Sequence, residues 1–183
     1  MITRRKFLAA GGALLAAPAA LAQQCRVTPR DALGPFYVKG APAKAELCAS
    51  ATGGAQKLTV SGRVFGMPEC APLAGALVEV WQADARGDYT QVTAGKKDDL
   101  GCLLRASLTT DAGGRYRFQT IVPGEYPGRP RHIHYRVSAQ GHATLVTQLY
   151  FARERGIPQE LVVTAAPKDG GLAASFDVTL ANA

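Results

Sequence analysis

The chain has 183 residues, of which 47% are hydrophobic and 19% charged, so we expect one globular domain and exclude a disordered or collagen-like chain. The formal charge of +7 suggests nucleic-acid binding, but three of the 21 basic residues, at positions 4–6, lie in a segment that we expect to be removed. Without these three, 18 basic residues face 14 acidic ones. No later apolar run approaches the ~20 residues that a membrane span requires. We therefore expect a mildly basic domain with neither a nucleic-acid partner nor a membrane span.

Residues 1–22 have the organisation of a twin-arginine signal peptide. They contain a basic start at residues 4–6, an apolar run at residues 9–21 and a small-x-small cleavage pattern at residues 20–22. The alternative is a buried N-terminal helix, which a glycine pair and Pro18 disfavour because each costs a helix about 1–3 kcal/mol. The sequence thus predicts cleavage after residue 22 and export by the twin-arginine pathway to the periplasm or the extracellular space.

The cysteines of the chain all lie beyond this segment, at Cys25, Cys48, Cys70 and Cys102. An even number of cysteines in an exported protein predicts two disulfides, which are stable in an oxidising compartment. Zinc binding is the alternative, but the spacings of 23, 22 and 32 residues contain no C-x-x-C pair. The sequence leaves the three ways of pairing four cysteines open.

From residue 57 onward the chain is organised as short alternating or apolar runs separated by turn signals. Short strands at this regular spacing, without a long helical period, predict an all-β, antiparallel sandwich or barrel. We expect it to form one domain, residues 57–183, with a turn at residues 111–114 of the kind found in hairpins. Residues 23–56, rich in Pro, Ala and Gly, form an N-terminal arm. The expected strands cover residues 57–65, 76–81, 103–108, 115–118, 132–137, 145–151, 160–164 and 176–180.

Two of the three histidines form the pattern His132-Ile133-His134. Residues i and i+2 of a strand point to the same side, so both imidazoles are expected to face one point. An isolated pair of this kind is also compatible with ordinary hydrogen-bonded strand histidines. Tyr126, in a Pro-Gly-x-Tyr-Pro turn, and Arg129 lie just upstream, and Tyr89 follows the loop that leaves an earlier strand. These neighbours favour a metal site.

The chain resembles the intradiol ring-cleavage dioxygenases, the catechol and protocatechuate family of non-haem ferric enzymes, over residues 34–151. Three features depart from the family: the helical N-terminal region of catechol dioxygenases is absent, the segment between residues 126 and 132 is short, as in the smaller exported members, and Arg131 replaces the usual small residue before the first histidine. The matching stretches are Gly34-Pro35-Phe36-Tyr37, Gly62-Arg63-Val64, Pro72 to Ala76, Val78 to Ala85, Gly87-x-Tyr89, Thr110 to Ile121, Pro123 to Pro127, Arg129-x-x-His132-Ile133-His134 and Thr147 to Phe151.

The resemblance implies a β-sandwich of transthyretin-like architecture with long active-site loops. It implies that two tyrosinates and two histidines hold Fe(III), and the matching ligands are Tyr89, Tyr126, His132 and His134. Tyr126 is further implied to leave the metal and act as the base when a catechol binds. Arg129 matches the arginine near the substrate and Gln148 the active-site glutamine. The implied reaction consumes a catechol-type ortho-diphenol and O2 and yields a cis,cis-muconate-type diacid.

Elementary chemistry agrees with such a ligand set. Ferric iron is a hard ion that anionic phenolate oxygens stabilise better than thiolate or imidazole alone. A phenol of pKa ~10 ionises at neutral pH only beside a strong positive charge, which the metal supplies. The tyrosines at 116, 135 and 150 and Trp81, by contrast, are expected to be core residues.

The alternative function is that of a non-catalytic, transthyretin-like β-sandwich binding module. The strand entry at residues 75–76 and the turn around residues 110–118 occur in that wider architecture without any metal. Retention of all four ligand positions together with Arg129 favours the enzyme. The sequence leaves open which catechol is the substrate and whether the chain forms a homo-oligomer or pairs with a second subunit.

Overall fold

The structure is a computed structural model that describes residues 25–48, 55–89, 102–126, 128–151 and 156–183. The predicted signal peptide lies outside these residues. Within them, no helix is long and apolar enough to cross a membrane. Their regular elements are strands and one short 3-10 helix: β1 (Lys57–Gly66), β2 (Ala71–Pro72), β3 (Leu77–Gln82), β4 (Arg105–Thr109), β5 (Arg115–Ile121), β6 (His132–Ser138), β7 (Leu145–Tyr150), η1 (Gln159–Leu161), β8 (Ala166–Lys168), β9 (Gly171–Ser175) and β10 (Val178–Leu180).

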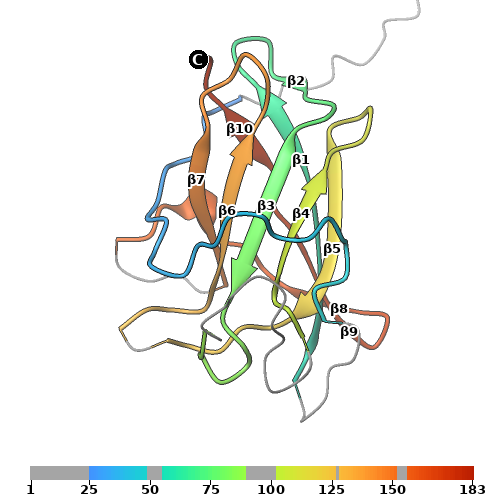
Figure 1. Ribbon diagram of the computed structural model, residues 1–183, viewed down its shortest axis with the longest axis vertical. Helices are drawn as coiled ribbons and strands as arrows, with labels where there is room; N and C mark the ends of the chain where they lie inside the picture. Colours follow the sequence, from blue (N-terminus) through green and yellow to red (C-terminus); the bar gives the residue numbers. More distant parts are fainter. Residues whose placement is uncertain (1–24, 49–54, 90–101, 127, 152–155) are drawn as a thin grey trace, which may run out of the picture.

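The strands form two sheets that pack face to face (Figure 1). One sheet has the order β4-β3-β6-β7 and is antiparallel throughout. The other is built around β1, which pairs antiparallel with β5 and β2 on one side. On its other side β1 pairs in parallel with β9 and then with β10. The all-β sandwich is confirmed; most of its strand pairs are antiparallel, and β1 also pairs in parallel with β9 and β10.

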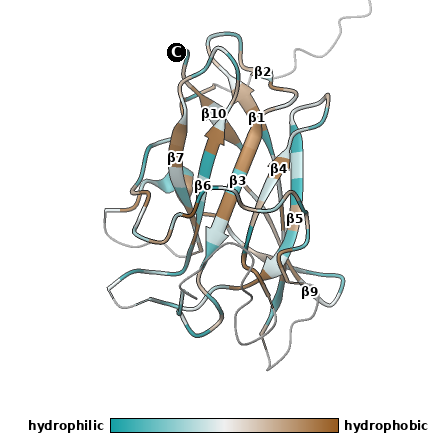
Figure 2. Ribbon diagram, in the orientation of Figure 1, coloured by the Kyte–Doolittle hydropathy of each residue, from teal (hydrophilic) through white to brown (hydrophobic). Residues whose placement is uncertain are grey.

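Successive side chains of a strand point to opposite faces of the sheet, and this alternation separates the core from the functional face. In β6 the odd-numbered residues Ile133, Tyr135 and Val137 are fully buried between the sheets. His132 and His134 point to the opposite, outer face of the same sheet. In Figure 2, hydrophilic residues (teal) interrupt β6, whereas most of the neighbouring β3 is hydrophobic (brown). Tyr116 and Tyr135 belong to the core, as predicted.

Three local predictions are corrected by the structure. Residues 160–164 are not a strand, because Pro158 begins the 3-10 turn η1 and only Val162 makes an isolated bridge, to Tyr150. The last predicted strand, residues 176–180, is shortened to β10, because residues 176–177 form the connection between β9 and β10. The turn at residues 111–114 forms, with Asp111 Oδ1 accepting the Gly113 and Arg115 amides, but it joins β4 and β5 in different sheets instead of forming a hairpin.

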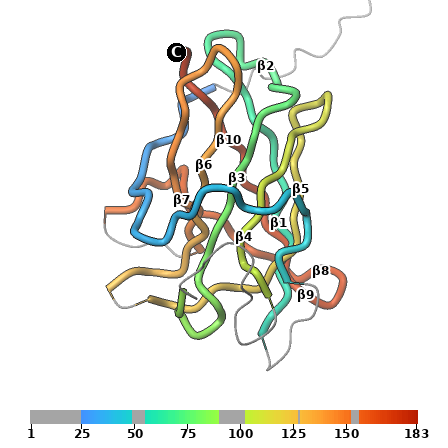
Figure 3. The backbone as a smooth tube through the Cα atoms, viewed as in Figure 1, coloured from blue at the N-terminus to red at the C-terminus, as the bar shows by residue number. Residues whose placement is uncertain are grey.

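The N-terminal arm, described here over residues 25–48, has no strand of its own and crosses the outer face of the β4-β3-β6-β7 sheet (Figure 3). Backbone hydrogen bonds attach it along its length, among them Asp31 N to Val146 O at 2.9 Å and Leu47 N to Gln119 O at 2.8 Å. Disulfides fix both ends of the arm, Cys25 to Cys70 and Cys48 to Cys102. The two predicted disulfides are therefore confirmed, and the arm covers the face that carries the histidine pair.

Candidate metal centre

The two histidines of β6 converge on one point, as the strand geometry predicts. Their Nε2 atoms lie 3.1 Å apart, and both side chains are buried. The Nδ1 atom of His132 lies 2.6 Å from the Pro130 carbonyl oxygen. Since that oxygen only accepts, Nδ1 carries the proton, and the Nε2 lone pair is left facing His134. A carbonyl behind a histidine is the arrangement that orients a metal ligand.

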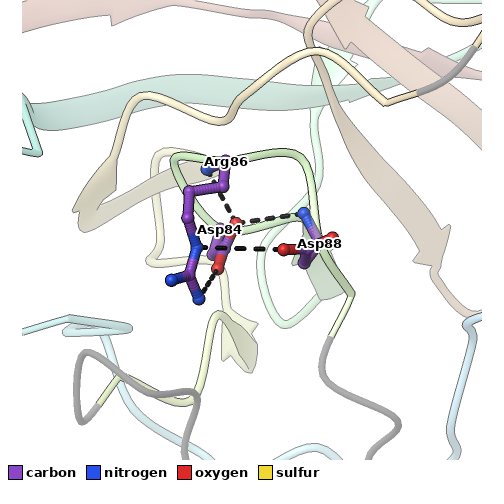
Figure 4. Close-up of polar contacts among 3 residues, drawn as sticks. All are labelled: Asp84, Arg86 and Asp88. Atoms are coloured by element: carbon purple, nitrogen blue, oxygen red, sulfur yellow. Dashed lines mark hydrogen bonds and ion pairs between the residues drawn. The ribbon is translucent and has the colours of Figure 1, made fainter.

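Tyr89 follows a tight loop that Asp84 organises. The carboxylate of Asp84 is buried, and its Oδ1 accepts the amides of Arg86 at 2.7 Å and Asp88 at 3.0 Å (Figure 4). The Arg86 guanidinium adds a contact of 3.2 Å to Oδ2. Because both carboxylate oxygens are used within the loop, Asp84 fixes the path of the chain from β3 to Tyr89. The hydroxyl of Tyr89 lies 3.3 Å from His132 Nε2.

The loops that carry Tyr89 and Tyr126 touch through two glycines. Gly87 has a positive φ of 91°, and a Cβ there would meet the Glu125 carbonyl oxygen at 1.8 Å. Gly124 donates its amide to the Asp84 carbonyl at 2.7 Å. Side chains at these two positions would therefore push the loops apart. Close approach of the backbones brings the rings of Tyr89 and Tyr126 to a centroid distance of 5.8 Å.

Phe36 of the arm packs against both of these tyrosines. Its ring stacks on Tyr89 with centroids 4.1 Å apart and meets Tyr126 edge-on at 6.0 Å. The ring of Tyr126 lies 6.5 Å from that of His132. All four predicted ligand residues are thus brought to one place from β6 and two loops. That they hold a metal stays a prediction.

Burial sets the protonation of these groups in the chain alone. Burial, together with the neighbouring His132 and Arg129, lowers the pKa of His134 to about 3. Burial also lowers the pKa of His132, so both imidazoles are neutral at pH 7 and have lone pairs to offer. Burial and the Tyr126 phenol raise the pKa of Tyr89 above its ordinary value. A phenolate at Tyr89 therefore requires a cation beside it.

The geometry and chemistry of this donor set fit a ferric ion. Two nitrogens bound to one metal at about 2.1 Å each lie about 3 Å apart when the angle between them is near 90°. The Nε2 atoms meet that condition, and the Tyr89 oxygen lies at a similar distance from one of them. Two imidazoles with phenol oxygens nearby, and no thiolate, suit a hard ion such as Fe(III). Among the residues described, no cluster of three His, Cys, Asp or Glu side chains offers another metal site.

Arg129 and Gln148 meet beside the histidines, as the resemblance implies. Arg129 Nη2 donates to Gln148 Oε1 and to the Tyr150 hydroxyl, each at 2.8 Å. Strand pairing explains the placement, because β7 sets Tyr150 opposite His132 and Gln148 opposite His134. Tyr150 was expected to be a core residue; it is buried, but its hydroxyl belongs to the site and also reaches Asp31 Oδ2 at 2.7 Å.

Trp81, also expected in the core, is buried and lies directly against His134. It is the cross-strand partner of His134, and the two rings stack with centroids 4.8 Å apart and planes inclined by 2°. Tyr37 of the arm packs on Trp81 at 5.0 Å and donates its hydroxyl to Glu79 at 3.1 Å. Trp81 thereby holds the ring plane of His134, and Tyr37 holds Trp81.

The sequence predicted no site role for Phe36, Asp31 or the hydroxyl of Tyr150, which was expected only in the core. A signal for Tyr150 was present, since a residue two positions after Gln148 on a strand shares its face. For Phe36 the signal was the matching stretch Gly34-Pro35-Phe36-Tyr37, whereas Asp31 lies outside the matching stretches and on a segment without a regular period. Only the path of the arm across the sheet brings Phe36 to Tyr89.

A cavity of about 500 Å³ opens beside Tyr126 and Arg129 and is also lined by Gly87 and Glu125. A larger one, of about 950 Å³, lies away from the histidines, near Arg63, Arg115 and Arg117. The smaller cavity is the better candidate for substrate entry because it adjoins the donor set.

The chain is similar to known dioxygenases. A family model described as dioxygenase matches residues 32–182. Catechol 1,2-dioxygenase 2 of Acinetobacter lwoffii is 40% identical over 143 residues, which make up 67% of this chain and 50% of that protein. The 6-chlorohydroxyquinol 1,2-dioxygenase of Cupriavidus pinatubonensis is 34% identical over 148 residues, 70% of this chain and 52% of that protein. The chain thus spans about half the length of these curated relatives.

A solved structure covers more of the molecule. The dioxygenase domain of a dioxygenase–carbohydrate-binding protein fusion from Streptomyces sp. SirexAA-E superposes with a TM-score of 0.74 at 35% identity, covering 86% of this chain and 100% of that one. The fold and the family match agree with one another. The chain therefore belongs to the intradiol ring-cleavage dioxygenase family.

Proposed function

We propose that this protein is a non-haem Fe(III) intradiol dioxygenase that cleaves a catechol-type ortho-diphenol between its two hydroxylated carbons. The observation that carries the proposal is that His132 Nε2 lies 3.1 Å from His134 Nε2 and 3.3 Å from the Tyr89 hydroxyl. Tyr126 adds a second phenol beside them. Fe(III) held by these four residues would bind the two diphenol oxygens and make the ring carbons reactive toward O2.

The protein's own groups supply the remaining requirements. Tyr126, half-buried at the rim of the entry cavity, is placed to take a proton from the diphenol as it binds. Arg129 brings a fixed positive charge to the negative charge that develops on the substrate, and Gln148 holds that guanidinium. Phe36 stacks on the ring of Tyr89 and would limit the access of water to it.

The proposed substrate class and product follow from this arrangement. Relatives that act on catechol and on 6-chlorohydroxyquinol point to a single-ring ortho-diphenol. With catechol, one molecule of the diphenol and one molecule of O2 combine to give one molecule of cis,cis-muconic acid. Both oxygen atoms enter the product, all hydrogens are retained, and no other oxidant or reductant is needed. The bond between the hydroxylated carbons breaks, and each of these carbons becomes a carboxyl carbon.

Iron analysis of the purified protein tests the proposal against the binding-module alternative. The enzyme is expected to hold about one iron per chain and to be red-brown, because phenolate bound to Fe(III) absorbs visible light. A turnover screen with catechol, protocatechuate and hydroxyquinol then identifies the substrate. Protein without iron that does not consume O2 with any of these diphenols, even after loading with ferric iron, would support the binding module.

We further propose that the protein is exported by the twin-arginine pathway. The two disulfides support this proposal, since disulfides persist mainly in oxidising compartments. Export of a folded chain would also allow iron to be bound before translocation. Mass spectrometry of the exported protein is expected to find a first residue at position 23, and protein that still begins at Met1 would refute cleavage.

A further inference from the structure

We propose that Asp31, on the N-terminal arm, is a positioning residue that holds the Arg129 guanidinium in its working orientation through the Tyr150 hydroxyl. The inference rests on the proposed function, because it assigns Asp31 a task in the same reaction. Neither the family motifs nor the strand pattern singles out Asp31. The contacts that connect it to Arg129 are all within 2.8 Å.

The arm holds Asp31 rigidly over strand β7. The backbone amide of Asp31 donates to the Val146 carbonyl at 2.9 Å, and the Thr147 hydroxyl donates to the Pro29 carbonyl at 2.8 Å. Asp31 Oδ1 accepts the amide of Ala32. These bonds leave Oδ2 as the carboxylate oxygen that faces Tyr150. Figure 3 shows this part of the arm running alongside β7.

A count of protons shows why the carboxylate matters. The Tyr150 hydroxyl has one proton and two acceptors in reach, Asp31 Oδ2 at 2.7 Å and Gln148 Oε1 at 2.8 Å. A carboxylate is the stronger acceptor, so the proton is directed to Asp31. The lone pairs of the Tyr150 oxygen and the Gln148 Oε1 are then both free to accept from Arg129 Nη2.

The same stretch of arm also fixes the orientation of Gln148. The Gln148 Nε2 donates to the Ala32 carbonyl at 2.7 Å, which forces Oε1 to face Arg129. Gln148 is fully buried, so an inverted amide would set its N–H group against the guanidinium with no acceptor. Residues 31 and 32 therefore orient both acceptors of Arg129, and through them the charge that faces the substrate.

Without the carboxylate, the hydroxyl proton of Tyr150 has only Gln148 Oε1 left to bind. It then competes with Arg129 for that oxygen, and the guanidinium loses its fixed place. The expected consequence is poorer stabilisation of charge developing after the diphenol has bound, with the metal ligands undisturbed.

The test compares Asp31→Ala, Asp31→Asn and Tyr150→Phe with Glu46→Ala, an exposed carboxylate on the same arm that serves as the matched control. Asp31→Ala and Tyr150→Phe are expected to lower kcat about 10- to 100-fold, the usual effect of removing an outer partner of a site. The iron content and the visible spectrum of the resting enzyme are expected to stay at wild-type values. The kcat of Asp31→Asn should lie between those of Asp31→Ala and the wild type, because an amide oxygen can still accept the hydroxyl proton. The kcat of Glu46→Ala should match that of the wild type.

A double-mutant cycle separates positioning from a general structural role. If Asp31 acts through Arg129, Asp31→Ala has no further effect on kcat/KM or on the anaerobic dissociation constant of catechol once Arg129→Ala is present. Equal losses in both backgrounds, a loss of iron in proportion to activity, or wild-type kcat in Asp31→Ala would each overturn the proposal.

High-resolution crystal structures of the wild type and Asp31→Ala keep this inference distinct from the proposed function. An Arg129 side chain that is ordered in the wild type and displaced or disordered in the variant supports positioning whether or not catechol is turned over. An unchanged Arg129 contradicts it even in an active dioxygenase.

Discussion

The Nε2 atoms of His132 and His134 lie 3.1 Å apart, with the His132 Nδ1 proton held by the Pro130 carbonyl. With that proton fixed, the His132 Nε2 lone pair faces His134 and can accept a hydrogen bond from His134 Nε2 or bind a cation. A cation bound as proposed would take the Nε2 lone pairs of both histidines, and the Tyr89 oxygen 3.3 Å from His132 would extend the donor set. Substitutions at this donor set and in the loops that surround it therefore have distinct expected effects on iron binding and on turnover.

Tyr89→Phe removes one proposed phenolate. We expect iron occupancy to fall and the visible absorption band to shift or disappear, because one of two charge-transfer ligands is gone. Absorption spectra and iron analysis of the purified variant provide the readout. Tyr116→Phe is the matched control: its hydroxyl binds the Phe176 carbonyl in the core, so about 1 kcal/mol of stability is expected to be lost with the band intact. A variant at position 89 with full iron and an unchanged spectrum would remove Tyr89 from the ligand set.

Arg129→Ala is expected to separate chemistry from assembly. The guanidinium contacts Gln148 and Tyr150 and none of the proposed ligands within hydrogen-bonding distance among the described residues, so iron content should stay near the wild-type value. We expect kcat to fall about 100-fold or more, the usual effect of removing a charge that stabilises a transition state. Arg131→Ala, at an exposed neighbour, should retain activity. Parallel losses of iron and kcat in Arg129→Ala would show that the residue is structural.

Asp84→Ala tests the loop that carries Tyr89. The change leaves the amides of Arg86 and Asp88 without their acceptor and frees the chain between β3 and Tyr89. We expect iron affinity to fall about 10- to 100-fold, measured by competition with a chelator. Asp88→Ala is the control, since the carboxylate of Asp88 is exposed and its nearest contact to Arg86 is 3.8 Å. Equal iron affinity in the two variants would contradict the role given to Asp84.

The disulfides are expected to stabilise the arm on the sheet. In the chain-entropy account, closing loops with separations of 45 and 54 residues contributes about 4 kcal/mol each to the free energy of unfolding. Cys25→Ser combined with Cys70→Ser should therefore lower the melting temperature markedly, as should the double change at Cys48 and Cys102. In the native protein all four thiols should resist alkylation until they are reduced. Rapid alkylation of the folded, unreduced protein would show that the bridges are absent.

Local periodicity predicted the parts of the fold and of the site that depend on neighbouring residues. The i, i+2 rule placed His132 and His134 on one face, and turn signals bounded most of the strands that were found. Periodicity could not show that β1 pairs in parallel with β9 and β10, because such pairing joins segments more than a hundred residues apart. Periodicity also predicted a strand at residues 160–164, where a turn that begins at a proline prevents strand pairing.

The arm explains why the rest of the site escaped prediction. Residues 25–48 have no strand, so their side chains have no periodic direction that a sequence could reveal. Phe36 gains its place against Tyr89, and Asp31 its place against Tyr150, only from the path of the arm between its two disulfides. Contacts made by irregular chain across a sheet depend on the whole fold.

The position of ring cleavage tests the central claim most directly. Enzyme incubated with catechol under 18O2 should give colourless cis,cis-muconate, identified by mass spectrometry, with one labelled oxygen in each carboxyl group apart from exchange with water. Two phenol donors and no carboxylate in the proposed ligand set favour Fe(III) and cleavage between the hydroxylated carbons. A yellow semialdehyde product, or turnover that needs added ferrous iron and stops on oxidation, would contradict the account.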